Sequence, residues 1–281
     1  MKLHYFGTAA AEGIPGMFCT CPTCIRSRAA GGRNIRTRSQ AQVDGQLLID
    51  FPADTYEHML HGGLDLPQVT SCLVTHSHED HLYPQDFENR KPGFAHVGTV
   101  DTWFGGPLHI YATAKALETA RVPGREYLEE QGVIKLHEVV PYEPFEVEGY
   151  AVTALRADHS ADAGPVIYHI RRGDKALLYA NDTGYFPDET WDYLTRVRPH
   201  MNYVSLDCTG MFHPGYRHGH MSIPVDAEVR DRLLAIGCAD EHTIFCVHHF
   251  SHNGGMTHDE LVPAAAAQGF LVSYDGMEIE F

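Results

Sequence analysis

Four side chains that can bind transition metals stand close together in the first half of the chain. His76, His78, Asp80 and His81 fall within six residues, in the segment Thr-His-Ser-His-Glu-Asp-His. Imidazole and carboxylate ligands suit zinc, manganese and iron, with the choice set by geometry and supply. A solvated histidine-rich loop is the competing interpretation. The His-x-His-x-Asp-His spacing is specific enough to predict a metal centre instead.

Further ligands are expected where other strands end, because four side chains do not complete two metal sites. The motif itself follows the apolar run 72–74, which predicts a buried strand and a tight loop. Three more polar pairs directly follow predicted strands: Asp158-His159 after 150–157, Asn181-Asp182 after 176–180, and His248-His249 after 243–247. Neighbouring side chains of a strand face opposite sides, so only one of the last pair can bind. The spacing to His252 favours His249.

A second group of metal-binding side chains lies near the N-terminus. Cys19, Cys21 and Cys24 offer three thiols within six residues, and soft thiolates at such spacing select zinc. A structural site needs a fourth ligand from elsewhere, and we expect His252, three residues after His249. One strand end would then serve both metal sites. Free thiols in a mobile loop are the alternative.

The elements that must position these groups are strands first, then interspersed helices, then strands again. Two sheets covered by helices in a single domain, residues 1–281, is the natural α/β (α+β) architecture. Hairpins are predicted within 40–50 at Asp44-Gly45, within 166–180 at Gly173-Asp174, and between 270–274 and 277–281 at Asp275-Gly276. Helices are predicted over 113–121, over 225–236, and from a capping box at 257–260 through Ala267.

One segment does not fit this pattern of regular elements. Residues 83–106 have weak periodicity and contain several glycines, prolines and aromatic residues. We expect them to form a long loop beside the active site, since loops of this length are uncommon unless functional or disordered.

Composition narrows the possible partners. A net charge of −16 repels a phosphate backbone and disfavours extended nucleic acid, whereas a pair of divalent cations would still admit a small phosphorylated substrate. No stretch approaches the ~20 apolar residues of a membrane span, and the N-terminus does not resemble a signal peptide. We therefore expect a cytoplasmic protein without membrane contact.

Seven cysteines, an odd number, argue against a disulfide framework. A homodimer is only the general expectation for a soluble enzyme.

Together these motifs resemble the metallo-β-lactamase superfamily, whose fold is an αββα sandwich. The resemblance covers nearly the whole chain. It implies that His76, His78 and His159 hold one metal ion and that Asp80, His81 and His249 hold a second. Asp182 would bridge both. Two ions ~3.5–4 Å apart can activate a bridging water and clamp the attacked phosphoryl or acyl centre.

The cysteine motif narrows the resemblance to PhnP-type cyclic phosphodiesterases. An early Cys-x-Cys-x-x-Cys with a late His-x-x-His is typical of this branch, and the segments 7–10 and 275–279 also suit it. The resemblance implies two active-site ions (manganese, zinc or iron) and a small phosphodiester substrate, such as a cyclic ribose phosphate. It also implies one structural zinc held by Cys19, Cys21, Cys24 and His252. The resemblance does not extend to the segment 83–106.

Phosphodiester cleavage also needs a proton for the leaving alkoxide, and histidine suits this role. His213, His218 and His220 lie in one loop after a predicted strand at 203–206. His220 directly precedes a helix for which Ser222 is a plausible N-cap, and a histidine near this point assists catalysis in the PhnP relatives. We therefore expect Asp80 and His220 to be the catalytic residues, with His218 as the alternative acid.

Three other functions fit parts of the sequence. A thioesterase or lactonase of the same superfamily would share the metal motif. A transfer-RNA-processing nuclease is disfavoured by the net charge and the lack of a basic arm. A non-catalytic metal-binding protein is disfavoured because all seven candidate ligands are intact.

Overall fold

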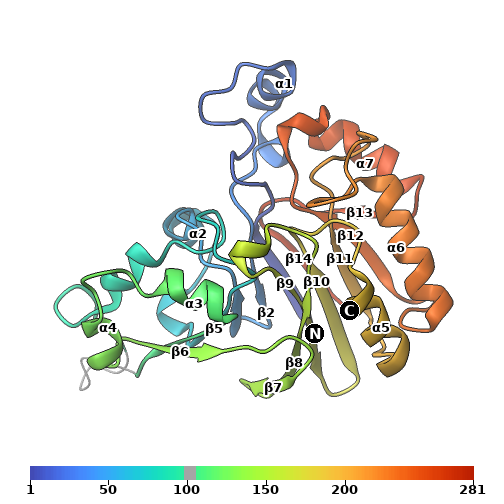
Figure 1. Cartoon of the computed structure of the whole chain (residues 1–281). Coiled ribbons are helices and arrows are strands. Elements are labelled where there is room, and N and C mark those ends of the chain that lie inside the picture. The colour runs from blue at the N-terminus through green and yellow to red at the C-terminus, as the bar shows by residue number, and fades with distance from the viewer. Residues whose placement is uncertain (98–105) are drawn as a thin grey trace.

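The computed structural model describes residues 1–97 and 106–281. In this part of the chain the strands form two seven-stranded sheets (Figure 1). The first sheet has the order β14-β1-β2-β3-β4-β5-β6, and its strands are β1 Lys2–Gly7, β2 Gln40–Val43, β3 Leu47–Ile49, β4 Ser71–Leu73, β5 Leu108–Ala112, β6 Ile134–Glu138 and β14 Met277–Glu280. The second has the order β13-β12-β11-β10-β9-β8-β7, and its strands are β7 Pro144–Val147, β8 Tyr150–Arg156, β9 Val166–Arg172, β10 Lys175–Ala180, β11 Tyr203–Asp207, β12 Ile244–His248 and β13 Leu271–Val272.

Helices cover the outer faces of both sheets, while α1 stands on a projection above them (Figure 1). The α-helices are α1 Pro22–Ala30, α2 Thr55–His61, α3 Ala114–Ala120, α4 Tyr127–Glu130, α5 Asp188–Val197, α6 Ile223–Ile236 and α7 His258–Ala266. The short 3-10 helices are η1 Gly32–Asn34, η2 Leu66–Gln68, η3 Pro84–Arg90, η4 Ala161–Ala163 and η5 His252–Gly254. These layers make the αββα sandwich that the sequence predicts.

Apolar side chains fill each interface between the layers. Leu3 and Val43 of the first sheet share a buried cluster with Val152 and Leu177 of the second. Two further clusters lie under the helices, one around Trp191 and one around Ile110. Because both faces of each sheet are buried in this way, several strands read as continuous apolar runs.

Most of the predicted elements are present. The hairpin at Asp44-Gly45 joins β2 and β3 with both turn residues at positive φ, and β9 pairs antiparallel with β10 around Gly173. The capping box that opens α7 has both of its reciprocal hydrogen bonds. Ser222 is at the N-cap position of α6, but its hydroxyl donates to the Tyr216 carbonyl and makes no capping bond.

The predicted closing hairpin is wrong. β13 pairs in parallel with β12 in the second sheet, whereas β14 pairs antiparallel with β1 in the first. The turn at Asp275-Gly276 therefore carries the chain from one sheet to the other. A turn signal between two apolar runs does not reveal this, because the same residues serve a hairpin and a sheet-to-sheet crossing.

The segment 83–106 is more regular at its start than the prediction of a loop. Pro84–Arg90 forms η3, and Phe87 is buried against Phe51. With α2, η3 lines a cavity of about 350 Å³. None of the predicted metal ligands is among the cavity's described lining residues. Residues 98–105, which complete the predicted loop, lie outside the described residues.

Over the described ranges, no helix is both long enough and apolar enough to cross a membrane.

Candidate metal centre

The predicted ligands meet at one end of the sandwich, where loops from both sheets come together. The loop after β4 is tied to the second sheet by hydrogen bonds from Val166 N to Thr75 O (3.0 Å) and from Ser77 N to Ala163 O (3.2 Å). The hydroxyl of Tyr168 on β9 donates to Val74 O (2.8 Å). These bonds hold the His-x-His-x-Asp-His loop against the strand ends that carry the remaining candidates.

Three histidines form the first cluster. A ring nitrogen of each of His76, His78 and His159 lies within 4.8 Å of the others. The Nδ1 atom of His78 is 2.9 Å from His76 Nε2 and 3.2 Å from His159 Nε2. Three imidazole nitrogens converging on one point from two sheets can hold one divalent ion.

The second cluster lies next to the first. Asp80, His81, Asp182 and His249 each offer one ligand atom within 4.8 Å of the rest. Asp182 Oδ2 lies 2.5 Å from His81 Nε2 and 3.2 Å from His249 Nε2. It also lies 3.6 Å from His76 Nε2 of the first cluster. Asp182 therefore faces both clusters, as a bridging ligand would.

Two of these residues adopt backbone conformations that favour glycine. Asp182 has φ of 48° and His249 has φ of 61°. Non-glycine residues at positive φ are uncommon, and such strain concentrates at functional sites. Both lie just beyond a strand, β10 or β12, where a left-handed turn aims the side chain back over the end of the sheet.

The outward nitrogens of His81 and His76 have partners that fix their orientation. His81 Nδ1 donates to Asp50 Oδ2 at 2.7 Å. The Thr75 hydroxyl also donates to Asp50 and lies 3.1 Å from His76 Nδ1. With Nδ1 engaged, Nε2 of each ring can present its lone pair to the centre. Such outer partners set the tautomer of metal-binding histidines.

The same arrangement holds for the ligands from the second sheet. His159 Nδ1 donates to the Gly219 carbonyl at 3.0 Å. His249 Nδ1 lies 2.8 Å from the Thr209 hydroxyl, which itself donates to the His249 carbonyl at 2.9 Å. Nε2 is again left facing inward. In the described part of the chain, the buried Nε2 atoms of His81 and His249 make no hydrogen bond of acceptable geometry, although Asp182 Oδ2 lies close to both.

The carboxylates at the centre create a negative environment that favours bound cations. Burial alone lowers the pKa of His81, but Asp80, Asp182 and Asp50 outweigh it and raise the pKa well above its ordinary value. For His249, Asp182 and Asp207 overcome burial and raise the pKa to about 10. Carboxylates and inward lone pairs only accept, so they need protons or metal ions between them. The donors match those of zinc, manganese and iron, so the residues fit a pair of divalent ions.

His220, the predicted acid, lies at the edge of the centre. Its Nδ1 is 2.9 Å from Asp207 Oδ2 and 3.3 Å from Asp182 Oδ1. Its side chain is 27% exposed, so the ring reaches from buried carboxylates toward solvent. His218, the alternative, is 85% exposed and pairs with Asp158 at 3.0 Å. The geometry therefore favours His220 over His218.

Asp50 and Asp207 were not among the predicted site residues. Asp50 directly follows β3, and Asp207 ends β11. Asp207 is buried, and its Oδ1 accepts from the amides of Thr209 and Met221. Together with Asp182, His220 and His249 it forms a further group of close ligand atoms. The signal that found the other ligands, a polar residue at a strand end, applies to both.

The four predicted zinc ligands also come together. Cys19 Sγ and Cys21 Sγ lie 3.7 and 3.5 Å from His252 Nδ1, and Cys24 completes the group within 4.8 Å. The Gly16 amide donates to Cys24 Sγ at 3.2 Å. Burial raises the pKa of Cys21, but hydrogen bonds from the Cys24 amide and neighbouring groups lower it to about 6. All seven cysteines are free. A thiolate-rich set of three sulfurs and one nitrogen fits tetrahedral zinc.

His248 and the remaining cysteines belong to none of the ligand groups among the described residues. His248 faces away from His249 and bonds to Ser39 at 2.8 Å. Cys72, Cys208, Cys238 and Cys246 are buried among apolar side chains.

Comparison with known families identifies the class of protein. A model of the beta-lactamase superfamily domain matches residues 48–250. The chain therefore belongs to the metallo-β-lactamase superfamily, as the sequence predicts. No curated protein matches the chain. Strands β1, β2 and β14 of the first sheet lie outside the matched residues.

Solved structures share the fold at low sequence identity. A diphosphatase described as a member of the PhnP family is 20% identical with a TM-score of 0.72, covering 100% of this chain and 96% of that one. Zn²⁺-bound PqqB from Methylobacterium extorquens is 20% identical with a TM-score of 0.74, covering 100% of both chains. The short form of human tRNase Z is 17% identical with a TM-score of 0.61, covering 100% of this chain and 99% of that one. These likenesses establish the fold.

Proposed function

We propose that this protein is a two-metal hydrolase that cleaves a small phosphodiester, such as a cyclic ribose phosphate. The observation that carries the proposal is Asp182, whose carboxylate faces both ligand clusters. His76, His78 and His159 would hold one ion, and Asp80, His81 and His249 the other. When bound, a pair of divalent ions supplies an activated water and neutralises charge on the attacked centre.

The chain's own groups would manage the leaving group's proton. Asp207 Oδ2 lies 2.9 Å from His220 Nδ1 and can accept its hydrogen bond. The opposite nitrogen, Nε2, is then free to carry a proton to the leaving oxygen. A positioned acid of this kind contributes ~10²–10⁴-fold. Asp207 would orient the ring and stabilise the imidazolium form.

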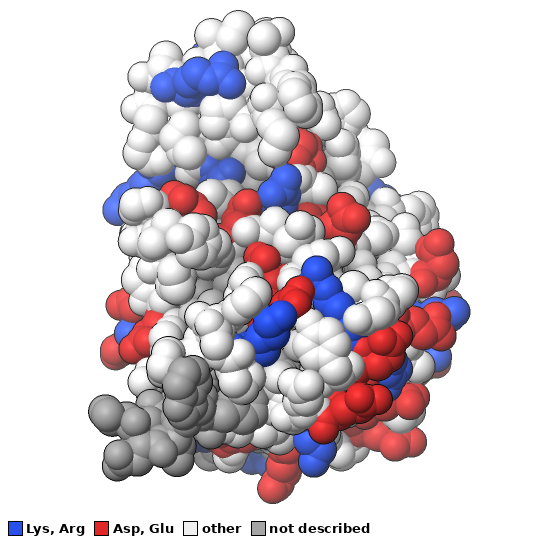
Figure 2. Space-filling view, turned by 90° about the vertical axis from the view of Figure 1, so that its left-hand side faces the viewer, with Lys and Arg blue, Asp and Glu red and all other residues white. Residues whose placement is uncertain are grey.

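A small substrate is favoured over a long polynucleotide. The net charge is −16, and on the face in Figure 2 the Lys and Arg side chains appear as separate groups among white and red atoms. Binding along a polynucleotide needs a continuous basic surface. The thiolate cluster supports a structural zinc and the PhnP-type branch. Its free thiols suit a reducing compartment such as the cytoplasm.

The first test is metal content together with hydrolysis of bis-p-nitrophenyl phosphate. We expect three ions per chain, two at the His/Asp centre and one at the thiolates. Asp80→Ala should abolish turnover because it removes a ligand of the second ion. Glu79→Ala is the matched control, since Glu79 is exposed in the same loop and belongs to no ligand group.

The substrate panel decides between the reaction classes. A thioester, a lactone and a diphosphate ester should be measured beside the diester. Metals present without diester turnover, but with thioester or lactone turnover, would replace the proposal by the thioesterase or lactonase function. Near-normal diester hydrolysis by Asp80→Ala with verified metal content would refute the ligand assignment.

A further inference from the structure

Glu12 contacts two residues of the segment that joins the two metal sites. Its carboxylate accepts a short hydrogen bond from the Ser251 hydroxyl, and the same oxygen, Oε1, lies 3.6 Å from His252 Nε2. The opposite nitrogen of His252, Nδ1, faces the thiolates of Cys19 and Cys21. A carboxylate on the outer nitrogen of a ligating imidazole fixes its tautomer and raises its basicity. Glu12 has this position toward His252.

The segment 249–252 is short and held from both sides. His249, at its start, faces Asp182 of the His/Asp centre, and His252, at its end, faces the thiolates. On one side the Thr209 hydroxyl donates to the His249 carbonyl, and the Thr209 carbonyl accepts a hydrogen bond from the Ser251 amide at 3.3 Å. On the other side Glu12 binds Ser251 and approaches His252. His249 and His252 are thus joined by three peptide bonds that are held by contacts on both sides.

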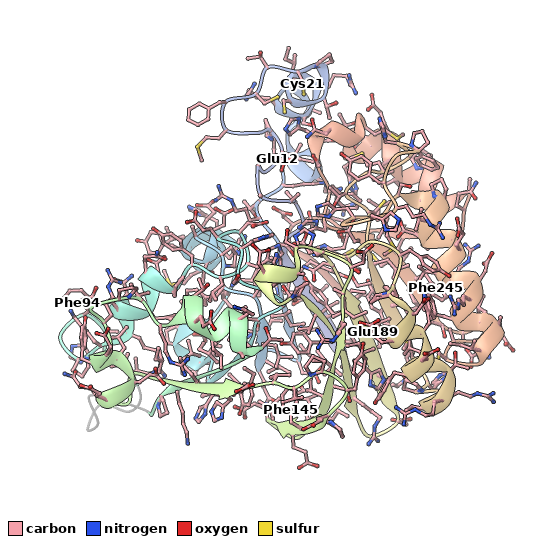
Figure 3. All side chains as sticks on the ribbon, viewed as in Figure 1. Glu12, Cys21, Phe94, Phe145, Glu189 and Phe245 are labelled. Atoms are coloured by element: carbon pink, nitrogen blue, oxygen red, sulfur yellow. The ribbon has the colours of Figure 1, made fainter. Side chains whose placement is uncertain are left out.

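The strand-like stretch that leads to Glu12 is bound to the same segment. Phe250 N donates to Thr8 O and Ala10 N donates to Phe250 O, both at 2.9 Å. Figure 3 shows Glu12 at the base of the projection and Cys21 at its top. A Cβ at Gly16 would lie 3.3 Å from the His252 ring, so the projection packs closely on this histidine. The projection and the segment 249–252 therefore form one connected unit.

We propose that Glu12 is a positioning residue that couples the thiolate zinc site to the second position of the His/Asp centre. Zinc at the thiolates fixes His252, Glu12 and Ser251 transmit that constraint, and His249 is held in its left-handed conformation toward Asp182. The first position, made of His76, His78 and His159, receives no ligand from this segment and is independent of it. This inference rests on the ligand assignment of the proposed function and extends it to the regulation of metal loading.

The test is metal binding by the full chain, with manganese as the probe for the His/Asp centre. Protein with zinc restored at the thiolates is titrated with Mn²⁺, and free Mn²⁺ is followed by its EPR signal. Asp80→Ala gives the isotherm of the first position alone. Glu12→Ala should weaken the second position and lower zinc retention against a chelator, each by ~10-fold, the usual effect of losing an outer-shell partner. Mn²⁺ binding at the first position should not change.

Two further variants separate positioning from a general loss of stability. Glu12→Gln keeps an oxygen that can accept from Ser251 beside His252, and should restore most of the affinity at both sites. Glu118→Ala removes an exposed carboxylate that pairs with Lys115 on α3, and should leave both sites unchanged. Replacing zinc by Co²⁺ reports the thiolate site separately through its sulfur-to-metal charge-transfer band.

Zinc loss in Glu12→Ala with an unchanged Mn²⁺ isotherm would overturn the coupling. Unchanged zinc retention and Mn²⁺ binding would show that Glu12 positions neither site. Failure of the proposed function gives a different result, since wild-type protein would then bind two Mn²⁺ ions with the coupling intact but hydrolyse no diester. If Glu12→Ala does not fold, Ser251→Ala interrupts the same contact and carries the same expectations.

Discussion

Adjacent histidines at the end of β12 show how a residue's surroundings decide its role. His248 and His249 are both buried. Burial, together with His249 and Arg36, lowers the pKa of His248 well below its ordinary value, and its Nε2 bonds to Ser39 and Tyr179. The pKa of His249 is instead raised to about 10 by Asp182 and Asp207, which overcome its burial. His248 is therefore a neutral core residue, whereas His249 faces carboxylates that can bind a cation together with it.

Replacing Asp207 should affect catalysis in a way that depends on the leaving group. In Asp207→Asn the amide oxygen would accept from the two backbone amides that Asp207 Oδ1 now binds, so its NH₂ would face His220 Nδ1. That reverses the tautomer of His220 and removes the charge that stabilises its imidazolium. We expect turnover of an alkyl phosphodiester to fall ~10²–10⁴-fold. Hydrolysis of bis-p-nitrophenyl phosphate should fall less, because p-nitrophenolate leaves without a proton.

Asp158→Asn is the matched control, since Asp158 holds His218 as Asp207 holds His220. It should leave the ratio of the two rates at the wild-type value. The reverse pattern, with the selective loss in Asp158→Asn, would make His218 the acid.

For single residues, the sequence predicts the candidate metal ligands better than it predicts the residues that hydrogen-bond to those ligands. The seven His/Asp candidates stand in motifs whose spacing is visible, and the structure gathers all of them. Asp50, Thr75 and Thr209 act through hydrogen bonds to other side chains. A polar residue at a strand end can be recognised, but which of these residues becomes such a partner is set by distances across two sheets, and no local spacing records those distances.

Among the elements, three loops at the ends of β8, β10 and β11 are bound tightly to one another. Gly184 N donates to Asp158 O, and Tyr185 N donates to Arg217 O, both at 2.8 Å. A Cβ at Gly184 would lie 2.5 Å from Arg217 O and from Asp158 Oδ2. It would also lie 2.8 Å from the Gly219 amide. Gly184 therefore sets how closely the loop of His220 approaches the loop of His159.

Gly184→Ala should separate these loops and weaken the first metal position. The new methyl group cannot fit against the Arg217 carbonyl oxygen at 2.5 Å and the Gly219 amide at 2.8 Å, so the His159–Gly219 hydrogen bond should lengthen. We expect metal affinity at that position to fall ~10-fold, measured by Mn²⁺ titration, together with diester turnover. In Gly215→Ala, within the same loop, the methyl group meets only ordinary contacts with His213 at 3.4 Å or more. If both variants bind metal equally well, the close packing at Gly184 does not position the site.

The sequence predicts elements well where local chemistry decides them. Alternation and turn residues identify β9 and β10, and the capping box identifies α7. The closing hairpin fails because pairing partners are set by the whole sandwich, which places β13 and β14 in different sheets. Helix α5 was missed, although Trp191 and Leu194 on its buried face pack into the core. Only Pro187 closely precedes this helix, and its ten residues are amphipathic, so the sequence does carry a signal for it.

The whole molecule buries several histidines that the metal centre does not use, and this makes its stability depend on pH. His169 on β9 is a clear case. Burial lowers its pKa to about 4, with Arg171 adding to the effect and the backbone of His200 opposing it. Its Nε2 has no hydrogen-bond partner among the described residues. A histidine in the unfolded chain becomes protonated below its ordinary pKa of ~6.5. In the folded state the His169 ring stays neutral over most of that range.

His169→Phe should make the protein less sensitive to acid. At a pH between the pKa of His169 in the unfolded chain and its folded value of about 4, only the unfolded state has a protonated His169 ring. The free energy of unfolding therefore falls as the pH falls through this range. His169 contributes ~2 kcal/mol of that loss at pH 5. A phenylalanine of similar shape cannot titrate. We expect the free energy of unfolding, from urea denaturation, to match wild type within ~1 kcal/mol at pH 7.5 and to exceed it by ~2 kcal/mol at pH 5. Metal loss in acid affects both proteins alike and cancels in the difference.

His242→Gln, at a side chain that is 86% exposed, should follow the wild-type pH dependence. If His169→Phe also follows it, the His169 ring is protonated in the folded protein and its burial does not oppose the charge.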